Sequence, residues 1–349
     1  MILFGAFIKS FTVVAVVALV GGQALRAVEP ATGEQKKAFR EALDAAQAQS
    51  DGALSITGSD GWYFFNKELL HLLSERYWGE GVNNPLPAIL DFKAQLDKAG
   101  VELLVVPVPA KAAIYPDKLS ASIPSPPSTP RDLADQDAAF IEALQSHGVE
   151  VLDLTGDFLQ ARGGGVDTHC RTDTHWSPEG VRIAAKKIAE KVSGNSWISE
   201  QPRLPVRTEV AEIQIRGDLT PADGPIEKLP AFRVVEANVP DSVGIPDSRT
   251  SPVVLLGDSH NLVFHSGGEM HASGAGLADQ LCMELGFPMD VVAVMGSGST
   301  AARRNLARRK DNLEGKKLVI WCFSSREFTQ GQGWAKVPVI KESVAPISR

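Results

Sequence analysis

The sequence predicts an α/β protein, a three-layer sandwich in which helices cover both faces of a central parallel sheet. Short apolar runs rich in β-branched residues alternate with helical patterns along most of the chain. Strands that are apolar on both faces are typical of parallel sheets buried between helices. The chain has 349 residues, of which 44% are hydrophobic, and is therefore long enough to bury a full core.

Five runs are predicted to form the strands, because each is short, apolar and flanked by turn residues or charges. They comprise residues 103–108, 149–154, 253–256, 291–295 and 318–323. Helical patterns accompany them at residues 86–99, 133–146, 181–192, 277–285 and 300–312. The helix at 181 follows Ser177-Pro178, an N-cap residue and a proline that suits the first helical position.

The remaining segments define the predicted domain organisation. Residues 1–27 are largely apolar and fit a secretory signal cleaved near Ala27, although a single lysine also allows an uncleaved membrane anchor. Both alternatives predict export of the rest of the chain. Residues 28–54 are predicted to be a linker or an N-terminal helix, and residues 55–349 one domain. Within that domain, residues 195–251 lack a clear βα unit and are predicted to be an irregular insertion.

The charge of the chain narrows the class of partner. The formal net charge is −7, whereas nucleic-acid-binding proteins usually carry a basic excess. We therefore expect no nucleic-acid partner.

A serine follows one predicted strand at the point where the chain turns. Gly257-Asp258-Ser259 comes directly after the run 253–256, so the Ser259 hydroxyl is expected at the carboxyl edge of the sheet, where open α/β folds bind ligands. Gly257 allows a tight turn, and backbone N–H groups after the turn are expected to help form an oxyanion hole. A turn that only caps a helix explains this segment equally well when it is taken alone.

A histidine and an aspartate supply what this serine lacks. In Asp173-Thr174-His175 the aspartate is placed to orient the imidazole, just ahead of a helix start. A serine hydroxyl attacks carbonyls poorly until a base takes its proton, so Ser259, His175 and Asp173 together predict acyl transfer. Asp167-Thr168-His169 repeats the same tripeptide, but only the second copy precedes a helix, and we favour that copy.

These motifs resemble the SGNH (GDSL-like) hydrolase superfamily, and more specifically the SGNH-like domain of the periplasmic alginate O-acetyltransferases of the AlgJ/AlgX type. The similarity runs from about residue 55 to the C-terminus, and its most specific part combines Asp-Thr-His-Trp at 173–176 with Gly-Asp-Ser-His at 257–260. Further matching segments are Asp-Gly-Trp-Tyr-Phe-Phe at 60–65, Val-Val-Pro-Val-Pro-Ala-Lys at 105–111 with Tyr-Pro at 115–116, and Arg-Gly-Asp-Leu-Thr at 216–220. As in that branch, the pair is Asp-x-His instead of Asp-x-x-His, and it precedes the serine as if the fold were circularly permuted.

The resemblance implies a flavodoxin-like SGNH fold with permuted motif order, and an enzyme that transfers acetyl groups to hydroxyls of an exopolysaccharide such as alginate. In it Ser259 is the nucleophile that carries the acetyl group, His175 the base and Asp173 its orienting acid. The resemblance also implies a periplasmic location, with the chain secreted across or anchored to the inner membrane. A membrane-bound partner protein would pass acetyl groups across the membrane. This chemistry needs no metal and no tightly bound cofactor.

Other residues are weaker candidates for substrate binding. Lys111 and Tyr115 follow one strand end and Arg326 follows the last strand, so these three are expected to line the cleft. Trp176 is expected either to stack on a sugar ring or to be a buried aromatic residue. Gly296 is a candidate oxyanion glycine, with a purely structural turn as the alternative.

Two other functions share these motifs. A carbohydrate acetyl esterase uses the same triad, and the difference is whether water or a sugar hydroxyl reaches the acyl-enzyme. A non-catalytic polysaccharide-binding subunit would keep the fold without turnover, and the complete Ser, His and Asp set speaks against it. Only the resemblance favours transfer over hydrolysis.

Overall fold

A five-stranded parallel sheet forms the centre of the protein. The computed structural model describes residues 30–80, 83–123, 132–239 and 244–341. The strand order is β4-β3-β9-β7-β8, and every neighbouring pair is parallel. The strands are β3 (Glu102–Val108), β4 (Glu150–Val151), β7 (Val253–Gly257), β8 (Asp290–Ala293) and β9 (Leu318–Ser324). Each overlaps one of the five predicted strands, so the predicted parallel sheet is confirmed.

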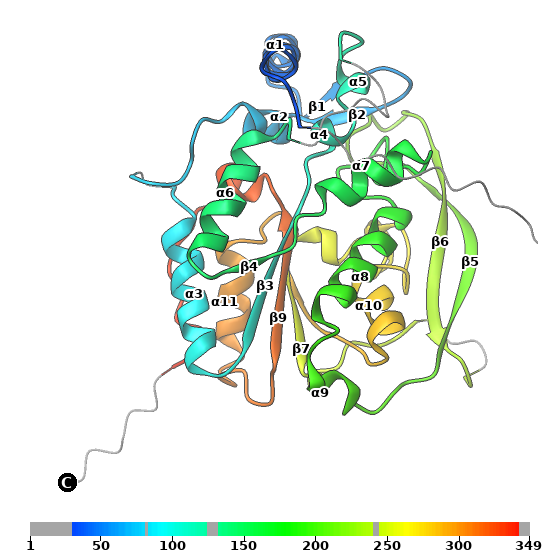
Figure 1. Ribbon diagram of the computed structural model, residues 1–349. Coiled ribbons are helices and arrows are strands. Elements are labelled where there is room, and N and C mark those ends of the chain that lie inside the picture. Colours follow the sequence, from blue (N-terminus) through cyan, green and yellow to red (C-terminus); the bar gives the residue numbers. More distant parts are fainter. Residues whose placement is uncertain (1–29, 81–82, 124–131, 240–243, 342–349) are drawn as a thin grey trace, which may run out of the picture.

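Helices cover both faces of this sheet, as Figure 1 shows. One face carries α3 (Leu86–Lys98), α6 (Asp135–Ser146) and α11 (Thr300–Arg308). The other carries α7 (Thr155–Gly163), α8 (Pro178–Val192) and α10 (Leu277–Leu285). Successive strand residues point to opposite faces: in β7, Val254 and Leu256 join one buried core, whereas Val253 and Leu255 join the other. This is the predicted three-layer sandwich.

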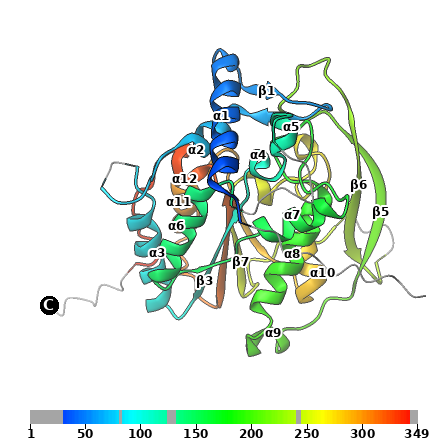
Figure 2. The same ribbon diagram turned by 45° about the horizontal axis from the view of Figure 1, so that its top comes forward.

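The N-terminal elements lie over the carboxyl ends of the strands, at the top of Figure 1 and toward the viewer in Figure 2. They are α1 (Gly33–Ser50), β1 (Ser55–Thr57), β2 (Tyr63–Phe65) and α2 (Asn66–Leu73), joined there by α4 (Lys111–Ile114) and α5 (Pro116–Leu119). Thr32 caps α1 by accepting the N–H of Gln35, and Phe39 and Leu43 of this helix are buried in the core. The helix expected within residues 28–54 therefore packs onto the sandwich.

The segment expected to be an irregular insertion is more regular than predicted. Residues 195–251 contain α9 (Ser196–Ser199) and an antiparallel ribbon of β5 (Val206–Ile215) and β6 (Glu227–Glu236), which pair along their whole length. Figure 1 shows this ribbon beside α8 and α10. The sequence signal was weak because β5 pairs with β6 alone among the described strands and fully buries only Ile215, while β6 buries residues such as Val234.

Two predicted elements are shorter than expected. The edge strand β4 pairs only through Glu150 and Val151, and Asp153 then accepts the backbone N–H of Thr155, where α7 begins. Helix α11 ends at Arg308 because the chain leaves the helical region, with positive φ values of 56° at Lys310 and 50° at Asn312.

The predicted signal or anchor at residues 1–27 lies outside the described residues. None of the helices described between residues 30 and 341 combines the length and apolar character that a bilayer span requires.

Candidate active site

Ser259 is the first residue of the 3₁₀ helix η1 (Ser259–Asn261), which follows β7 after a tight turn at Gly257 and Asp258. A Cβ on Gly257 would lie 1.6 Å from the carbonyl oxygen of Cys322 and 2.4 Å from Nδ2 of Asn261, so no larger residue fits there. The Asn261 side chain donates to the carbonyl oxygen of Cys322 at 2.8 Å. The turn that carries the serine is therefore tied to the neighbouring central strand β9.

The backbone donors after this turn are already used. Asp258 accepts the N–H of His260 through its carboxylate at 2.9 Å and the N–H of Asn261 through its carbonyl at 3.1 Å. The expected oxyanion hole therefore cannot use the N–H groups of His260 and Asn261. Ser259 begins η1, so its own N–H has no acceptor within that helix and is the candidate donor.

The structure brings Ser259, His175 and Asp173 together. Nε2 of His175 lies 2.8 Å from the Ser259 hydroxyl, and its Nδ1 lies 2.6 Å from Oδ1 of Asp173. The Asp173 carboxylate also accepts the backbone N–H of His175 at 3.0 Å. All three residues are buried. Because an ionised carboxylate only accepts, Nδ1 of His175 carries the proton and Nε2 accepts from the serine hydroxyl.

Charge and hydrogen bonding set the ionisation of this pair. Burial alone would lower the pKa of His175, but the Asp173 carboxylate outweighs it, so the pKa is raised from its ordinary value. Burial alone would raise the pKa of Asp173, yet the charge of His175 and hydrogen bonds from His175 and His271 hold that pKa well below its usual range. Asp173 is therefore a stable anion beside the imidazole.

The Asp-His loop is anchored by the helix that follows it. Ser177 caps α8, since its hydroxyl accepts the N–H of Gly180 at 3.1 Å. A Cβ on Gly180 would lie 2.2 Å from the carbonyl oxygen of Thr168. The predicted helix start thus holds the loop by a cap and by a close backbone approach that only glycine allows.

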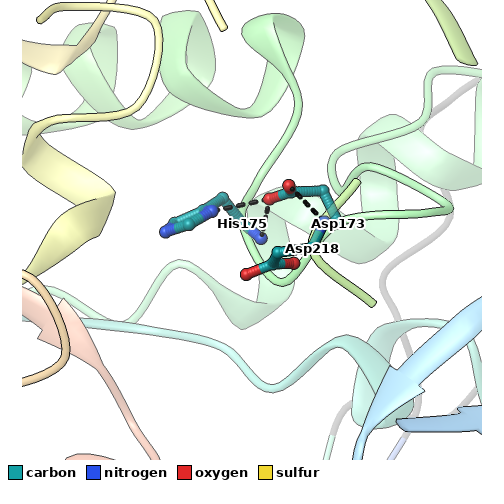
Figure 3. A group of neighbouring side chains, drawn as sticks. All are labelled: Asp173, His175 and Asp218. Carbon is teal, nitrogen blue, oxygen red and sulfur yellow. Dashed lines mark hydrogen bonds and ion pairs between the residues drawn. The ribbon is translucent and has the colours of Figure 1, made fainter. Parts of the chain in front are cut away.

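The Arg-Gly-Asp-Leu-Thr segment at 216–220 supports the same loop from the other side. A Cβ on Gly217 would lie 1.9 Å from the carbonyl oxygen of Thr172. The N–H of Asp218 donates to Oδ2 of Asp173 at 3.1 Å, and the Asp218 carboxylate accepts the N–H and hydroxyl of Thr174. Figure 3 shows the Asp173 carboxylate beside the His175 ring, with Asp218 next to them.

Asp173, His175 and Asp218 can also be considered as a cation site, because one ligand atom of each lies within 4.8 Å of the others. Their polar atoms are instead engaged with one another and with donors of the same loop, as described above. The cluster is therefore built to orient an imidazole.

Lys111, Tyr115 and Trp176 are buried, at most 1% exposed, so the expectation that they contact substrate is corrected. Lys111 donates from Nζ to the carbonyl oxygens of Asp173 at 2.5 Å and Tyr63 at 3.0 Å. The Tyr115 ring stacks on Trp62 with centroids 4.0 Å apart. Trp176 is a buried aromatic residue, the second of its two expected roles, and its ring lies edge-on to that of His260. Lys111 and Trp176 therefore support the Asp173–His175 loop from inside the protein.

Of the two remaining candidates, Arg326 stays compatible with substrate binding, whereas Gly296 is better explained by a turn. Arg326 is 8% exposed at the end of β9, donates to the Ser324 hydroxyl at 2.8 Å and lies over the Phe65 ring. Gly296 is exposed with a φ of 72°, and a Cβ there would meet nothing within 4 Å, which fits the structural-turn alternative. Gly298, two residues on, packs against Asp258 instead.

The rival Asp-Thr-His copy at 167–169 does not reach the serine. Nε2 of His169 lies 3.0 Å from the carbonyl oxygen of Pro109, and burial lowers the pKa of this histidine to about 3. Asp167 is turned outward and pairs with Arg171. The preference for the second copy thus agrees with the geometry.

Sequence reasoning missed a second imidazole beside the first. The His260 ring lies 4.9 Å from that of His175 and donates from Nδ1 to Asp258 at 3.1 Å. Burial lowers the pKa of His260 to about 4, so it is neutral at neutral pH and places no second cation next to His175. Its position directly after the serine was the available signal.

A buried acid behind the serine turn was also missed. Oε2 of Glu327, in α12 (Glu327–Gln330), accepts the N–H groups of Gly298 at 3.1 Å and Ser299 at 3.3 Å. Burial, with Asp258 acting in the same direction, raises the pKa of Glu327 to about 7. The sequence offered no pattern that marks this residue.

Glu327→Gln is expected to flatten the pH dependence of stability. An unfolded glutamate ionises near pH 4.5, so between about 4.5 and 7 the folded protein holds a proton that the unfolded chain releases. The free energy of unfolding of the wild type should therefore fall as the pH rises through that window, by on the order of 3 kcal/mol from this group. Urea unfolding from pH 5 to 8 measures it, with exposed Glu314→Gln as control; parallel curves for Glu327→Gln and wild type would contradict it.

The fold and the site define an α/β protein of the SGNH type, with a serine, a histidine and an aspartate gathered at the carboxyl edge of a parallel sheet. The sequence profile of the family described as "SGNH hydrolase-like domain, acetyltransferase AlgX" matches residues 56–325. The chain belongs to this family.

Relatives named in alginate biosynthesis are similar to the chain. "Probable alginate O-acetylase AlgJ" of Pseudomonas fluorescens is 28% identical over 217 residues, which cover 59% of this chain and 53% of that protein. The protein of the same name from Azotobacter vinelandii is 24% identical over 284 residues, covering 78% of this chain and 69% of its own length. The chain spans about half the length, or less, of the Pseudomonas relatives that it matches.

Two solved structures share the fold. The O-acetyltransferase domain of Pseudomonas putida AlgJ superposes with a TM-score of 0.58 at 22% identity, covering 78% of this chain and 91% of that one. Pseudomonas aeruginosa AlgX superposes with a TM-score of 0.56 at 18% identity, covering 77% and 62%. The SGNH-like architecture is confirmed.

Proposed function

We propose that this protein is an O-acetyltransferase that acetylates hydroxyl groups of an exopolysaccharide through an acetyl-serine intermediate. The observation that carries the proposal is the 2.8 Å approach of His175 Nε2 to the Ser259 hydroxyl, with Asp173 on the opposite ring nitrogen. A nucleophile in contact with its base, and a base oriented by a third group, is the arrangement that activates serine. Family membership supports acetyl as the transferred group.

The first step forms the acyl-enzyme. Oγ of Ser259 attacks the acetyl carbonyl of the donor while Nε2 of His175 takes the hydroxyl proton, and Asp173 stabilises the imidazolium that results. The carbonyl oxygen becomes an oxyanion, which the N–H of Ser259 is positioned to receive. When the tetrahedral intermediate collapses, His175 returns the proton to the departing oxygen of the donor, leaving an acetyl ester on Ser259.

The second step reverses these roles with a new alcohol. A sugar hydroxyl gives its proton to Nε2 of His175 and attacks the acetyl ester, and the bond to Oγ of Ser259 breaks. His175 then returns the proton to Oγ. One acetyl group moves from donor to sugar, and the enzyme regains its starting protonation state.

The acceptor we propose is an anionic polysaccharide such as alginate. Relatives of the chain are named for alginate acetylation and biosynthesis. Arg326 follows β9, the strand beside the one that precedes Ser259, and is partly accessible, so its guanidinium is our candidate to bind a uronate carboxylate near the acetyl-serine. We also propose a periplasmic site of action, either free or attached to the inner membrane through residues 1–27, and a membrane-bound partner that delivers acetyl groups.

Acetyl transfer to an oligouronate tests this function. Purified protein is incubated with an activated acetyl ester, with and without acceptor, and free acetate and acetylated sugar are both quantified. We expect acetylated oligouronate to form and acetate release to fall as the acceptor concentration rises. Acetate release that the acceptor leaves undiminished, with no acetylated sugar, would instead identify an esterase. If neither acetylated sugar nor free acetate forms, the protein is a binding subunit.

A further inference from the structure

A second histidine contacts the aspartate of the site from a different part of the chain. Nε2 of His271 lies 2.8 Å from Oδ2 of Asp173, the oxygen that faces away from the His175 ring. The His271 side chain is 13% exposed and Asp173 only 1%. An imidazole at the rim of the site thus reaches inward to a buried carboxylate.

The loop that carries His271 is shaped for this contact. It connects η1 to α10 and contains the short helix η2 (Gly268–Met270), after which His271 adopts a φ of 71°. A positive φ is unfavourable for a residue with a Cβ and tends to be retained where the surrounding structure enforces it. The N–H of His271 donates to the carbonyl oxygen of Gly268 at 3.0 Å, and the N–H of Gly267 donates to that of Ala272 at 2.8 Å. These bonds close the loop and hold the ring inward.

The two carboxylate oxygens of Asp173 accept from different donors. Oδ1 accepts from His175, while Oδ2 accepts from the His271 ring and from the N–H of Asp218. An ionised carboxylate only accepts, so Nε2 of His271 carries a proton. Two donors on Oδ2 restrain rotation of the carboxylate and keep Oδ1 directed at Nδ1 of His175. They also withdraw electron density from the oxygen that holds the base.

We propose that His271 is a positioning residue of the acetyl-transfer reaction, which directs Asp173 toward His175 and moderates how strongly Asp173 draws on that imidazole. The proposal rests on the function proposed above. Among the described residues, the His271 ring contacts the Asp173 carboxylate and the Phe264 ring, whose centroid lies 5.9 Å away. A donor at the Nε2 position is what the role requires.

Two substitutions separate a positioning role from a merely structural one. His271→Gln keeps an N–H donor near the position of Nε2, whereas His271→Leu fills the space without one. Glu269→Gln, an exposed change in the same loop, is the matched control. We expect His271→Leu to lower kcat/KM for acetyl-ester turnover by on the order of tenfold, as loss of a partner that orients an active group does. His271→Gln should restore most of the rate.

The pH profile gives the decisive measurement. With one donor fewer, Asp173 attracts the proton on His175 more strongly, so the acidic limb of kcat/KM should move to higher pH in His271→Leu and stay near wild type in His271→Gln. An unmoved or lowered limb in a folded His271→Leu protein would overturn the proposal. So would equal rates for the two variants.

A spectroscopic readout remains available whether or not the enzyme turns over. The His175 proton in the 2.6 Å hydrogen bond to Asp173 is expected to resonate far downfield in the proton NMR spectrum. In His271→Leu this signal and its titration midpoint should change, and in His271→Gln they should be retained. If the signal is unchanged in both variants, the proposed role of His271 is refuted and the proposed function is not. If the wild-type protein transfers no acetyl group, only the proposed function is refuted.

Discussion

Replacing Ser259 by alanine is expected to abolish covalent acetylation and to lower acetyl-ester turnover by about 10⁶-fold, the scale seen when a serine nucleophile is removed. The reason is chemical: His175 Nε2 would face a methyl group and have no hydroxyl proton to accept. The measurement is the intact-protein mass after exposure to an activated acetyl ester. Wild type should gain one acetyl group, and Ser259→Ala none.

The control for this experiment is Ser266→Ala, an exposed serine seven positions along the chain. It should acquire the adduct at the wild-type rate. His175→Ala is a useful companion, because it keeps the nucleophile and removes its base, so the adduct should form slowly instead of not at all. An acetyl group that still appears on Ser259→Ala would assign the nucleophile elsewhere and end the proposed mechanism.

Asp173→Asn should lower kcat/KM by about 10⁴-fold while the protein stays folded, as the equivalent change does in serine-protease triads. The carboxylate accepts four donors: His175 Nδ1, the His175 N–H, His271 Nε2 and the Asp218 N–H. An amide cannot accept all of them, and its NH₂ group favours the wrong tautomer of His175. Because Asp173 raises the pKa of His175, the acidic limb of the residual activity should also move to lower pH.

Asp167→Asn is the matched control for Asp173→Asn, because it changes the aspartate of the other Asp-Thr-His copy. Asp167 pairs with Arg171 near the surface, and His169 of the same copy donates from Nε2 to the carbonyl oxygen of Pro109, away from the serine. Its rate and pH profile should equal those of wild type within about twofold, since exposed ion pairs contribute little. Equal losses in the two variants would mean that the choice between the copies is unfounded.

Local signals were sufficient for much of the fold. The run 253–256 is apolar at every position because both faces of β7 are buried. A continuous apolar run that ends in glycine predicts a buried strand without knowledge of the strands beside it. The cap at Ser177 was readable for the same reason, as it depends on residues within one turn. The ribbon of β5 and β6 was missed because β6 buries its side chains against α8 and α10, contacts that its own sequence does not reveal, while β5 is largely uncovered.

Burial was the main source of error at the site. Lys111 and Tyr115 follow a strand end that does lie at the functional edge, yet both are buried there: the Trp62 ring stacks on Tyr115, and Tyr63 of β2 accepts from Lys111. A lysine is seldom fully buried, and here two backbone carbonyl acceptors compensate for its desolvation. The residues around position 111 do not predict these acceptors, because Tyr63 and Asp173 are distant from it in the sequence.

The sequence alone predicted the class of chemistry, because the proposed nucleophile, base and acid each lie beside a strand end, turn or helix start that local patterns reveal. Tertiary structure alone showed which further groups contact the proposed acid. Asp218 and His271 meet Asp173 across 45 and 98 positions of the chain. Hydrogen bonds require contact within about 3 Å, and only the folded backbone establishes contact between residues so far apart in sequence.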